Sequence, residues 1–194
     1  MRRWLVLAIT LAACGKSADK KDTTSDDKKP APSESDEPKG VSTKELVAAP
    51  LVSTSATAGG KPFTVDLPTS LLKKPEVKDA YATWAPTHEW FDSPGFTVQY
   101  MDMPLREGST GPSEPMGQDA ADRKIVRAEA LPGGGYINVD QRTDKKFVAL
   151  QVCRPAPGGY MCCSVTQRAD KPIDDFDAAV ALYAKICTSL KPGT

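Results

Sequence analysis

Histidine is the scarcest reactive side chain in this sequence, with one copy, His88, among 194 residues. A Ser-His-Asp arrangement would therefore have to be built on His88, and neither an HExxH motif nor a histidine-rich metal cluster is present. The GxSxG, GxGxxG and P-loop motifs are also missing, and Gly133-Gly134-Gly135 joins two predicted strands instead of leading a helix. The sequence predicts a protein that is not an enzyme and that carries no cofactor.

An excess of charge of either sign is also missing. The chain has 25 basic and 25 acidic residues, so its formal net charge is zero, and nothing in this balance attracts nucleic acid or anionic lipid. The acidic residues Asp119, Asp122 and Asp140 are too scattered to indicate a calcium loop. We therefore predict no nucleic-acid partner and no metal site.

The first fourteen residues indicate where the protein is sent. Arg2 and Arg3 give a positive start, an apolar run follows from Trp4 to Leu11, and small residues end at Cys14. This order is typical of a secretory signal. About ten apolar residues span roughly 15 Å as a helix, which is half of a hydrocarbon core, so the run is too short for a transmembrane anchor.

The ending Leu11-Ala12-Ala13-Cys14 resembles the lipobox of bacterial lipoproteins. The resemblance implies cleavage of residues 1–13, diacylglycerol on the sulfur of Cys14, and a further acyl chain such as palmitate on its freed amine. Several acyl chains hold a protein firmly at a membrane, whereas one does so only marginally. Gly15 stands where inner-membrane lipoproteins carry aspartate, so we expect the outer membrane. The alternative is ordinary secretion into the periplasm with an incidental cysteine.

The sequence then divides by composition. Residues 14–45 are mostly Lys, Asp, Ser, Glu, Thr and Pro, and such a segment cannot bury enough apolar surface to order itself, so we predict a disordered tether. Residues 46–60 are an ambiguous lead-in that could hold a short helix or a strand. Residues 61–192 are expected to form a single domain, large enough to bury a core.

The folded domain is expected to be α+β, with an antiparallel sheet packed against helices. Alternating apolar residues bounded by turn residues predict strands. A short helical turn is expected within Leu71–Trp84, and a helix over Ile173–Leu190 follows from apolar residues spaced three and four apart. The predicted strands are Phe63–Leu67, Glu89–Phe91, Phe96–Met101, Lys124–Leu131, Gly135–Arg142, Lys146–Cys153 and Tyr160–Arg168.

The other four cysteines lie near the end of a secreted chain, which indicates two disulfide bonds. Side chains alternate between the two faces of a strand. If Val152 lies across from Cys163 in a hairpin, Cys153 lies across from Cys162 on the opposite face. The pattern therefore predicts two bonds, Cys153–Cys162 within the hairpin and Cys163–Cys187 between sheet and helix.

Two places stand out as candidate sites. His88 and Glu89, beside Trp90 and Phe91, form the strongest candidate for a catalytic cluster. The favoured interpretation of these residues is a strand with its aromatic side chains in the core. The long loop 106–117 is rich in Gly, Pro and Ser, and recognition residues concentrate on such loops. Its expected contact residues are Arg106, Glu107, Glu114 and Met116.

The order of elements resembles the Mog1/PsbP-like fold. The opening Phe63-x-Val65-x-Leu67-Pro68 strand, the antiparallel run and the final helix ending Ser189-Leu190-Lys191 carry this resemblance. It implies a non-catalytic accessory or binding protein, able to bind an envelope protein. The membrane anchor through acylated Cys14 is what the lipobox resemblance implies. The alternatives are a small-ligand carrier with an apolar pocket between helix and sheet, and a hydrolase using His88 and Glu89.

Overall fold

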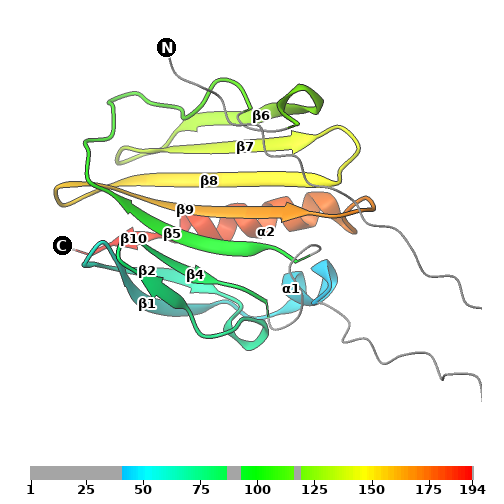
Figure 1. The fold of residues 1–194 in the computed structure, drawn as a ribbon, viewed down its shortest axis with the longest axis horizontal. Helices are drawn as coiled ribbons and strands as arrows, with labels where there is room; N and C mark the ends of the chain where they lie inside the picture. The colour runs from blue at the N-terminus through cyan, green and yellow to red at the C-terminus, as the bar shows by residue number, and fades with distance from the viewer. Residues whose placement is uncertain (1–40, 87–92, 116–118, 194) are drawn as a thin grey trace, which may run out of the picture. The chain divides into compact units, whose positions relative to one another are not determined.

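The computed structural model describes residues 41–86, 93–115 and 119–193, all within one compact unit. These residues form a mixed fold of mostly antiparallel strands with two α-helices, one of them near the C-terminus (Figure 1). The lipobox with Cys14 and the tether up to residue 40 lie outside the described residues. Within the described ranges, neither helix has the length and apolar character needed to cross a membrane.

The larger sheet has seven strands in the order β3-β4-β5-β9-β8-β7-β6, and each pair of neighbours is antiparallel. Strands β6 to β9 follow one another with short turns, which confirms the antiparallel arrangement expected from alternation. The strands are β3 (Glu76–Lys78), β4 (Tyr81–Trp84), β5 (Gly95–Met101), β6 (Arg123–Ala130), β7 (Tyr136–Arg142), β8 (Phe147–Ala156) and β9 (Gly159–Arg168).

A smaller sheet of three strands contains β1 (Val52–Ala58), β2 (Lys61–Leu67) and β10 (Lys191–Pro192), with β2 in the middle. Phe63, Val65 and Leu67 of β2 are buried, as the alternating pattern requires. Gly59 and Gly60 turn the chain from β1 to β2 with φ of 58° and 68°, a conformation that glycine adopts without strain. The lead-in at residues 46–60 is thus part of this hairpin and of the helix before it.

Helix α1 (Thr43–Ala48) begins inside the predicted tether, which therefore ends before residue 45. A capping box starts the helix: the Glu45 amide donates to Ser42 Oγ, and the Glu45 carboxylate accepts from the Ser42 amide and hydroxyl. These hydrogen bonds lower the pKa of Glu45. Leu46 is fully buried and fixes the helix to the core.

Helix α2 (Phe176–Thr188) lies within the predicted range of 173–190. Its buried side chains include Tyr183, Ile186 and Cys187, and the helix packs across β8, β9 and β2. We call the face of the seven-stranded sheet that meets α2 the inner face and the opposite one the outer face (Figure 1). Phe63 of β2 meets Trp84 edge-on at 6.1 Å between ring centroids, so β2 covers the β4 end of the inner face.

The prediction for Leu71–Trp84 is wrong beyond its start. A single 3-10 turn, η1 (Thr69–Leu71), is followed by the hairpin β3-β4. All three residues of β3 are exposed, so this edge strand has no apolar alternation from which it could be predicted. The predicted strand at Glu89–Phe91 lies outside the described residues. The second 3-10 turn, η2 (Ala120–Asp122), leads into β6.

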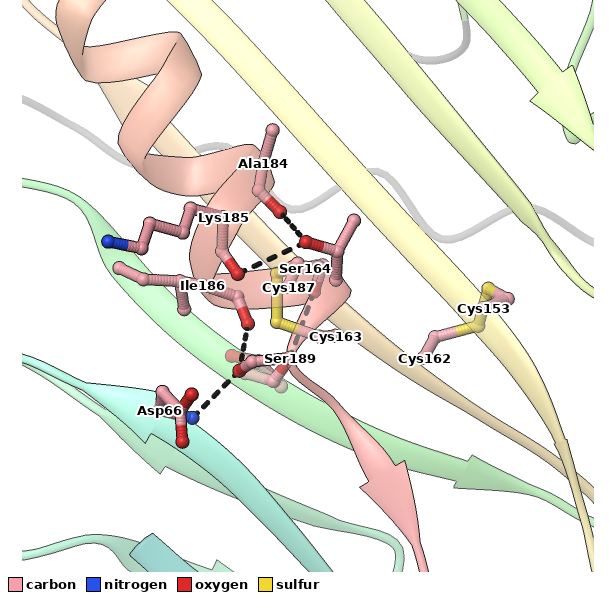
Figure 2. Close-up of a disulfide and its surroundings, with 12 residues drawn as sticks. Asp66, Cys153, Cys162, Cys163, Ser164, Ala184, Lys185, Ile186, Cys187 and Ser189 are labelled. Carbon is pink, nitrogen blue, oxygen red and sulfur yellow. Dashed lines mark hydrogen bonds between the residues drawn. A yellow bond between two sulfur atoms is a disulfide. The ribbon is translucent and has the colours of Figure 1, made fainter. Parts of the chain in front are cut away.

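Two disulfide bonds join Cys153 to Cys162 and Cys163 to Cys187, the pairs expected from alternation (Figure 2). Val152 lies across from Cys163 and Cys153 across from Cys162 in the β8-β9 register. The first bond is therefore on the outer face, and the second crosses from the inner face to α2. The Cys163–Cys187 bond therefore holds the last turns of α2 against the sheet.

The end of α2 is also held by Ser189. Its hydroxyl donates to the Ile186 carbonyl at 2.6 Å and accepts from the Asp66 amide of β2 at 2.8 Å (Figure 2). A neighbouring bond from the Arg154 guanidinium to the Thr188 carbonyl, at 3.2 Å, ties the same turn to β8. Helix, large sheet and small sheet therefore meet at this one turn.

Replacing both Cys163 and Cys187 by alanine should lower the free energy of unfolding by about 3.5 kcal/mol, since their bond closes the longer loop, with a sequence separation of 24. The matched double alanine variant at Cys153 and Cys162, whose separation is 9, should lose about 2.5 to 3 kcal/mol. Urea unfolding of the two variants measures this. An equal or larger loss for the Cys153–Cys162 variant would contradict the expected order.

Tyr183 joins α2 to the inner face in a second way. Its ring meets Phe96 edge-on at 6.0 Å, and its hydroxyl donates to Gln167 Oε1 at 2.6 Å. The side chain is fully buried, and this burial raises the pKa of the Tyr183 phenol well above its ordinary value of 10.0. The folded state therefore requires the protonated phenol.

A group whose pKa is raised on folding contributes stability below its unfolded pKa and loses it as the pH rises further. The free energy of unfolding should therefore fall above about pH 10, with Tyr183 contributing at most about 1.4 kcal/mol per pH unit. Tyr183→Phe should lower stability by about 1 kcal/mol at neutral pH through the lost hydrogen bond and should reduce the alkaline slope. Urea titrations between about pH 9 and 11 test this, and an unchanged slope would argue against it.

Candidate functional site

The outer face of the large sheet carries a row of polar side chains that crosses five strands. The strand register places Thr83, Thr97, Ser164, Gln151 and Asn138 directly beside one another, on β4, β5, β9, β8 and β7. Neighbouring strands are about 4.8 Å apart, so the row is roughly 19 Å long. On the inner face, the residues adjacent in sequence are the apolar side chains of the core.

Hydrogen bonds fix parts of this row. The hydroxyls of Thr83 and Thr97 are 3.2 Å apart, and Ser164 Oγ donates to the Thr97 carbonyl at 3.5 Å. At the other end, the Tyr136 hydroxyl donates to Gln151 Oε1 at 2.7 Å. Burial, and secondarily the nearby Tyr160, raise the pKa of Tyr136. Polar groups that are already oriented in this way can bind a polar ligand with little further ordering.

A groove with a volume of about 450 Å³ lies over the β4, β5 and β9 part of the row. We call it the outer groove. This volume is within the range of small-molecule sites in proteins. Its lining includes hydroxyls, carbon surface and two cationic side chains, contributed by Lys73, Thr83, Ala85, Pro86, Ser93, Gly95, Thr97, Ser164, Thr166 and Arg168.

Gly95 forms part of the floor of the outer groove. It begins β5 opposite Thr166, and the next residue, Phe96, points into the core. A Cβ at Gly95 would have no atom of the described residues within 4 Å, and the backbone of Gly95 does not have a positive φ. Neither the backbone φ of Gly95 nor its packing against the described residues therefore requires glycine here. A glycine inside a strand often marks a place where a ligand approaches the backbone closely.

The outer groove continues into a second hollow of about 230 Å³, which shares Ser164 and Thr166 with it. This hollow extends over β8, β7 and β6, and Pro112, Glu114 and Pro115 of the long loop form part of its wall. The polar row is therefore open over β4, β5 and β9 and bordered by the loop farther along the sheet.

The second hollow contains a buried ion pair. Arg123 of β6 binds Asp140 of β7 through two nitrogens, with Nε 3.2 Å from Oδ1, and each side chain is only 9% exposed. The Arg123 guanidinium also lies over the Phe147 ring, with its carbon 4.5 Å from the ring centroid. Two opposite charges held this way neutralise each other and act as a structural support.

The long loop, expected as the contact surface, is partly attached to the outer face. Asn138 Nδ2 donates to the Pro112 carbonyl at 2.9 Å, and Gly111 lies so close to the Tyr136 ring that a Cβ there would be 2.7 Å from it. Arg106, Glu107 and Glu114 are exposed and remain available as contacts, while Met116 lies outside the described residues.

The structure does not describe the other predicted candidates, His88 and Glu89, nor Trp90 and Phe91 beside them. Among the residues that it does describe, no three His, Cys, Asp or Glu side chains cluster as a metal site. Sequence reasoning missed Lys73, Gly95 and Arg168, because nothing in the sequence indicates that the three line one groove. Ser164 and Thr166 alternate with the apolar Cys163 and Val165 in the sequence, a signal by which their side of the strand could have been found.

Comparisons of this chain with protein-family models, with curated proteins and with solved structures find no match.

Asp140→Ala should lower the free energy of unfolding by about 3 kcal/mol, because Arg123 then loses its carboxylate partner in a buried position. Glu129→Ala is the matched control, since its pair with Arg127 is exposed and should contribute less than about 1 kcal/mol. Chemical denaturation measures both. Equal free energies of unfolding for the two variants would contradict a structural role for the Arg123–Asp140 pair.

Proposed function

We propose that this chain is a bacterial envelope lipoprotein with a non-catalytic binding domain, and that the outer groove is its binding site. The lipobox Leu11-Ala12-Ala13-Cys14 supports the anchor, and the polar composition of residues 15–40 suits a tether between membrane and domain. Two disulfide bonds suit an oxidising compartment such as the periplasm. Gly15 favours the outer membrane as the place of anchoring.

The fold that we propose for the domain is Mog1/PsbP-like. An antiparallel sheet with a C-terminal helix across one face supports this assignment, as does an opening strand that contains Phe63, Val65 and Leu67. The second cysteine pair and the long loop would be departures from the pattern of that fold. Accessory and binding roles are what the resemblance implies.

The observation that supports binding most directly is Gly95. A Cβ added at this strand position would meet no atom of the described residues within 4 Å, and Gly95 lines a groove of ligand size. The groove lies on the polar face of a sheet whose other face is packed against α2 and β2. A ligand can therefore bind there without any rearrangement of the core.

The small-ligand carrier is the second candidate, and the outer groove favours it over an accessory subunit that docks through apolar surface. Among the residues that the structure describes, the exposed large apolar side chains come from five different segments: Val47, Val52, Val77, Met103 and Val126. The groove is on the outer face, whereas the sequence led us to expect a pocket between helix and sheet. The hydrolase alternative rests on His88 and Glu89, which lie outside the described residues.

Cys14→Ser should abolish acylation. Grown with labelled palmitate, cells making the full chain should show a labelled, detergent-partitioning protein, whereas the Cys14→Ser chain should be unlabelled and remain soluble or uncleaved. Ser17→Ala, three residues further along, is the control and should behave like the wild type. A labelled or detergent-partitioning Cys14→Ser protein would contradict the anchor.

Gly95→Val tests the binding role, because Gly95 lines the groove and the new Cβ meets no atom of the described residues within 4 Å. Native mass spectrometry of the protein purified from its own envelope should find a small molecule bound to the wild type and lost from Gly95→Val. Ala128→Val, on the exposed edge strand β6, should retain it. A wild type without bound mass, or equal binding by all three proteins, would count against the outer groove as a binding site.

A further inference from the structure

The outer groove has an uneven distribution of charge. Two of its lining residues, Lys73 and Arg168, are cationic, and the other lining residues that the structure describes include no carboxylate. On the chain as a whole, by contrast, acidic and basic residues are equal in number. A site lined by one sign of charge favours ligands of the opposite sign.

Lys73 lies beside the C-terminal end of β4. Its amide donates to the Ala85 carbonyl at 2.8 Å, next to the bridge between Leu72 and Pro86, so its backbone is fixed against the wall of the groove. The Lys73 ammonium makes no ion pair with any of the described residues. Within the described part of the chain, no carboxylate therefore neutralises the Lys73 charge.

Arg168 approaches from the other side, at the end of β9. It shares the outer face with Ser164 and Thr166, and its guanidinium lies over Phe147 at 5.7 Å from the ring centroid. One bond, from Nη2 to Asp119 at 3.3 Å, offsets part of its charge. A guanidinium has five N–H donors, so this bond leaves others that can bind a ligand.

The walls between the two cations are suited to an organic body. Ala85, Pro86 and the bare backbone of Gly95 present carbon, while Ser164 and Thr166 present hydroxyls. Strands β4 and β9 are separated by one strand, which places the two walls about 10 Å apart. This width suits a planar or chain-like molecule with one charged end better than a compact inorganic ion.

We propose that the outer groove binds a small organic anion, with its carboxylate, sulfonate or phosphate held between Lys73 and Arg168 and its carbon body over Gly95. This inference rests on the proposed binding function and names the class of ligand. Bonds from a cationic donor to an anion are about twice as strong as neutral ones, so the two cations select the ligand while the floor sets its size.

The test uses two fluorescent probes that share one carbon skeleton. Anilinonaphthalene sulfonate carries a sulfonate, and phenylnaphthylamine is the same molecule without it. The protein is the chain from residue 14 to 194 with Cys14→Ser, which needs no detergent and contains every described residue. The anionic probe should bind with one saturable site and at least tenfold more tightly than the neutral probe, and its affinity should fall as salt is raised.

Lys73→Met and Arg168→Gln should each lower the affinity for the anionic probe by about tenfold, which is the change expected from losing one charge-assisted hydrogen bond. Binding of the neutral probe should not change in either variant. Lys185→Met on α2 and Arg127→Gln on β6 are matched controls of the same charge and exposed position, and both should bind like the parent.

Gly95→Val separates failure of this inference from failure of the proposed site. Equal binding of both probes, lost in Gly95→Val, would leave the groove as a site and overturn its preference for anions. Anionic binding that persists in Gly95→Val would place the probe elsewhere and overturn both proposals. Lack of saturable anionic binding would overturn the inference for this class of ligand.

Discussion

The alternation of side chains across one seven-stranded antiparallel sheet is the constraint on which the rest of the structure depends. Residues of one parity, such as Trp84, Val98 and Leu150, are removed from water beneath α2 and β2. Residues of the other parity must then face solvent or the long loop, because neighbouring side chains point to opposite faces. The outer face carries the polar row beside a small apolar cluster of Tyr136, Cys153 and Cys162, and a groove on this face does not compete with the packing of the main core.

The adjacent cysteines express the same constraint in covalent form. Cys162 and Cys163 are neighbours in sequence, yet one bonds across the outer face and the other crosses the core to Cys187. A slip of one residue in the β8-β9 register would reverse both faces and separate both pairs. The disulfide bonds and the apolar pattern therefore select the same β8-β9 register, and both oppose a slip of that register.

Much of the fold could be predicted from the sequence because the strands of the large sheet alternate clearly and end in glycine or proline turns. Alternation also predicted both cysteine pairs. It could not predict β3, whose three residues are all exposed, or the start of α1 inside a polar segment, where Ser42 and Glu45 form a capping box. The outer groove could not be predicted from the sequence for a different reason. Lys73, Gly95 and Arg168 are far apart in sequence, and only the strand order β4-β5-β9 brings them to one groove.

We propose that the outer face carries the binding site of the domain, whereas the inner face carries the main hydrophobic core. The most direct measurement is a nuclear magnetic resonance titration of residues 14–194, with Cys14→Ser, by the anionic probe. Amide shifts should be confined to Lys73, Gly95, Thr97, Ser164, Thr166 and their immediate neighbours on β4, β5 and β9. Shifts concentrated on α2, or on the loop residues Arg106, Glu107 and Glu114, would contradict the claim.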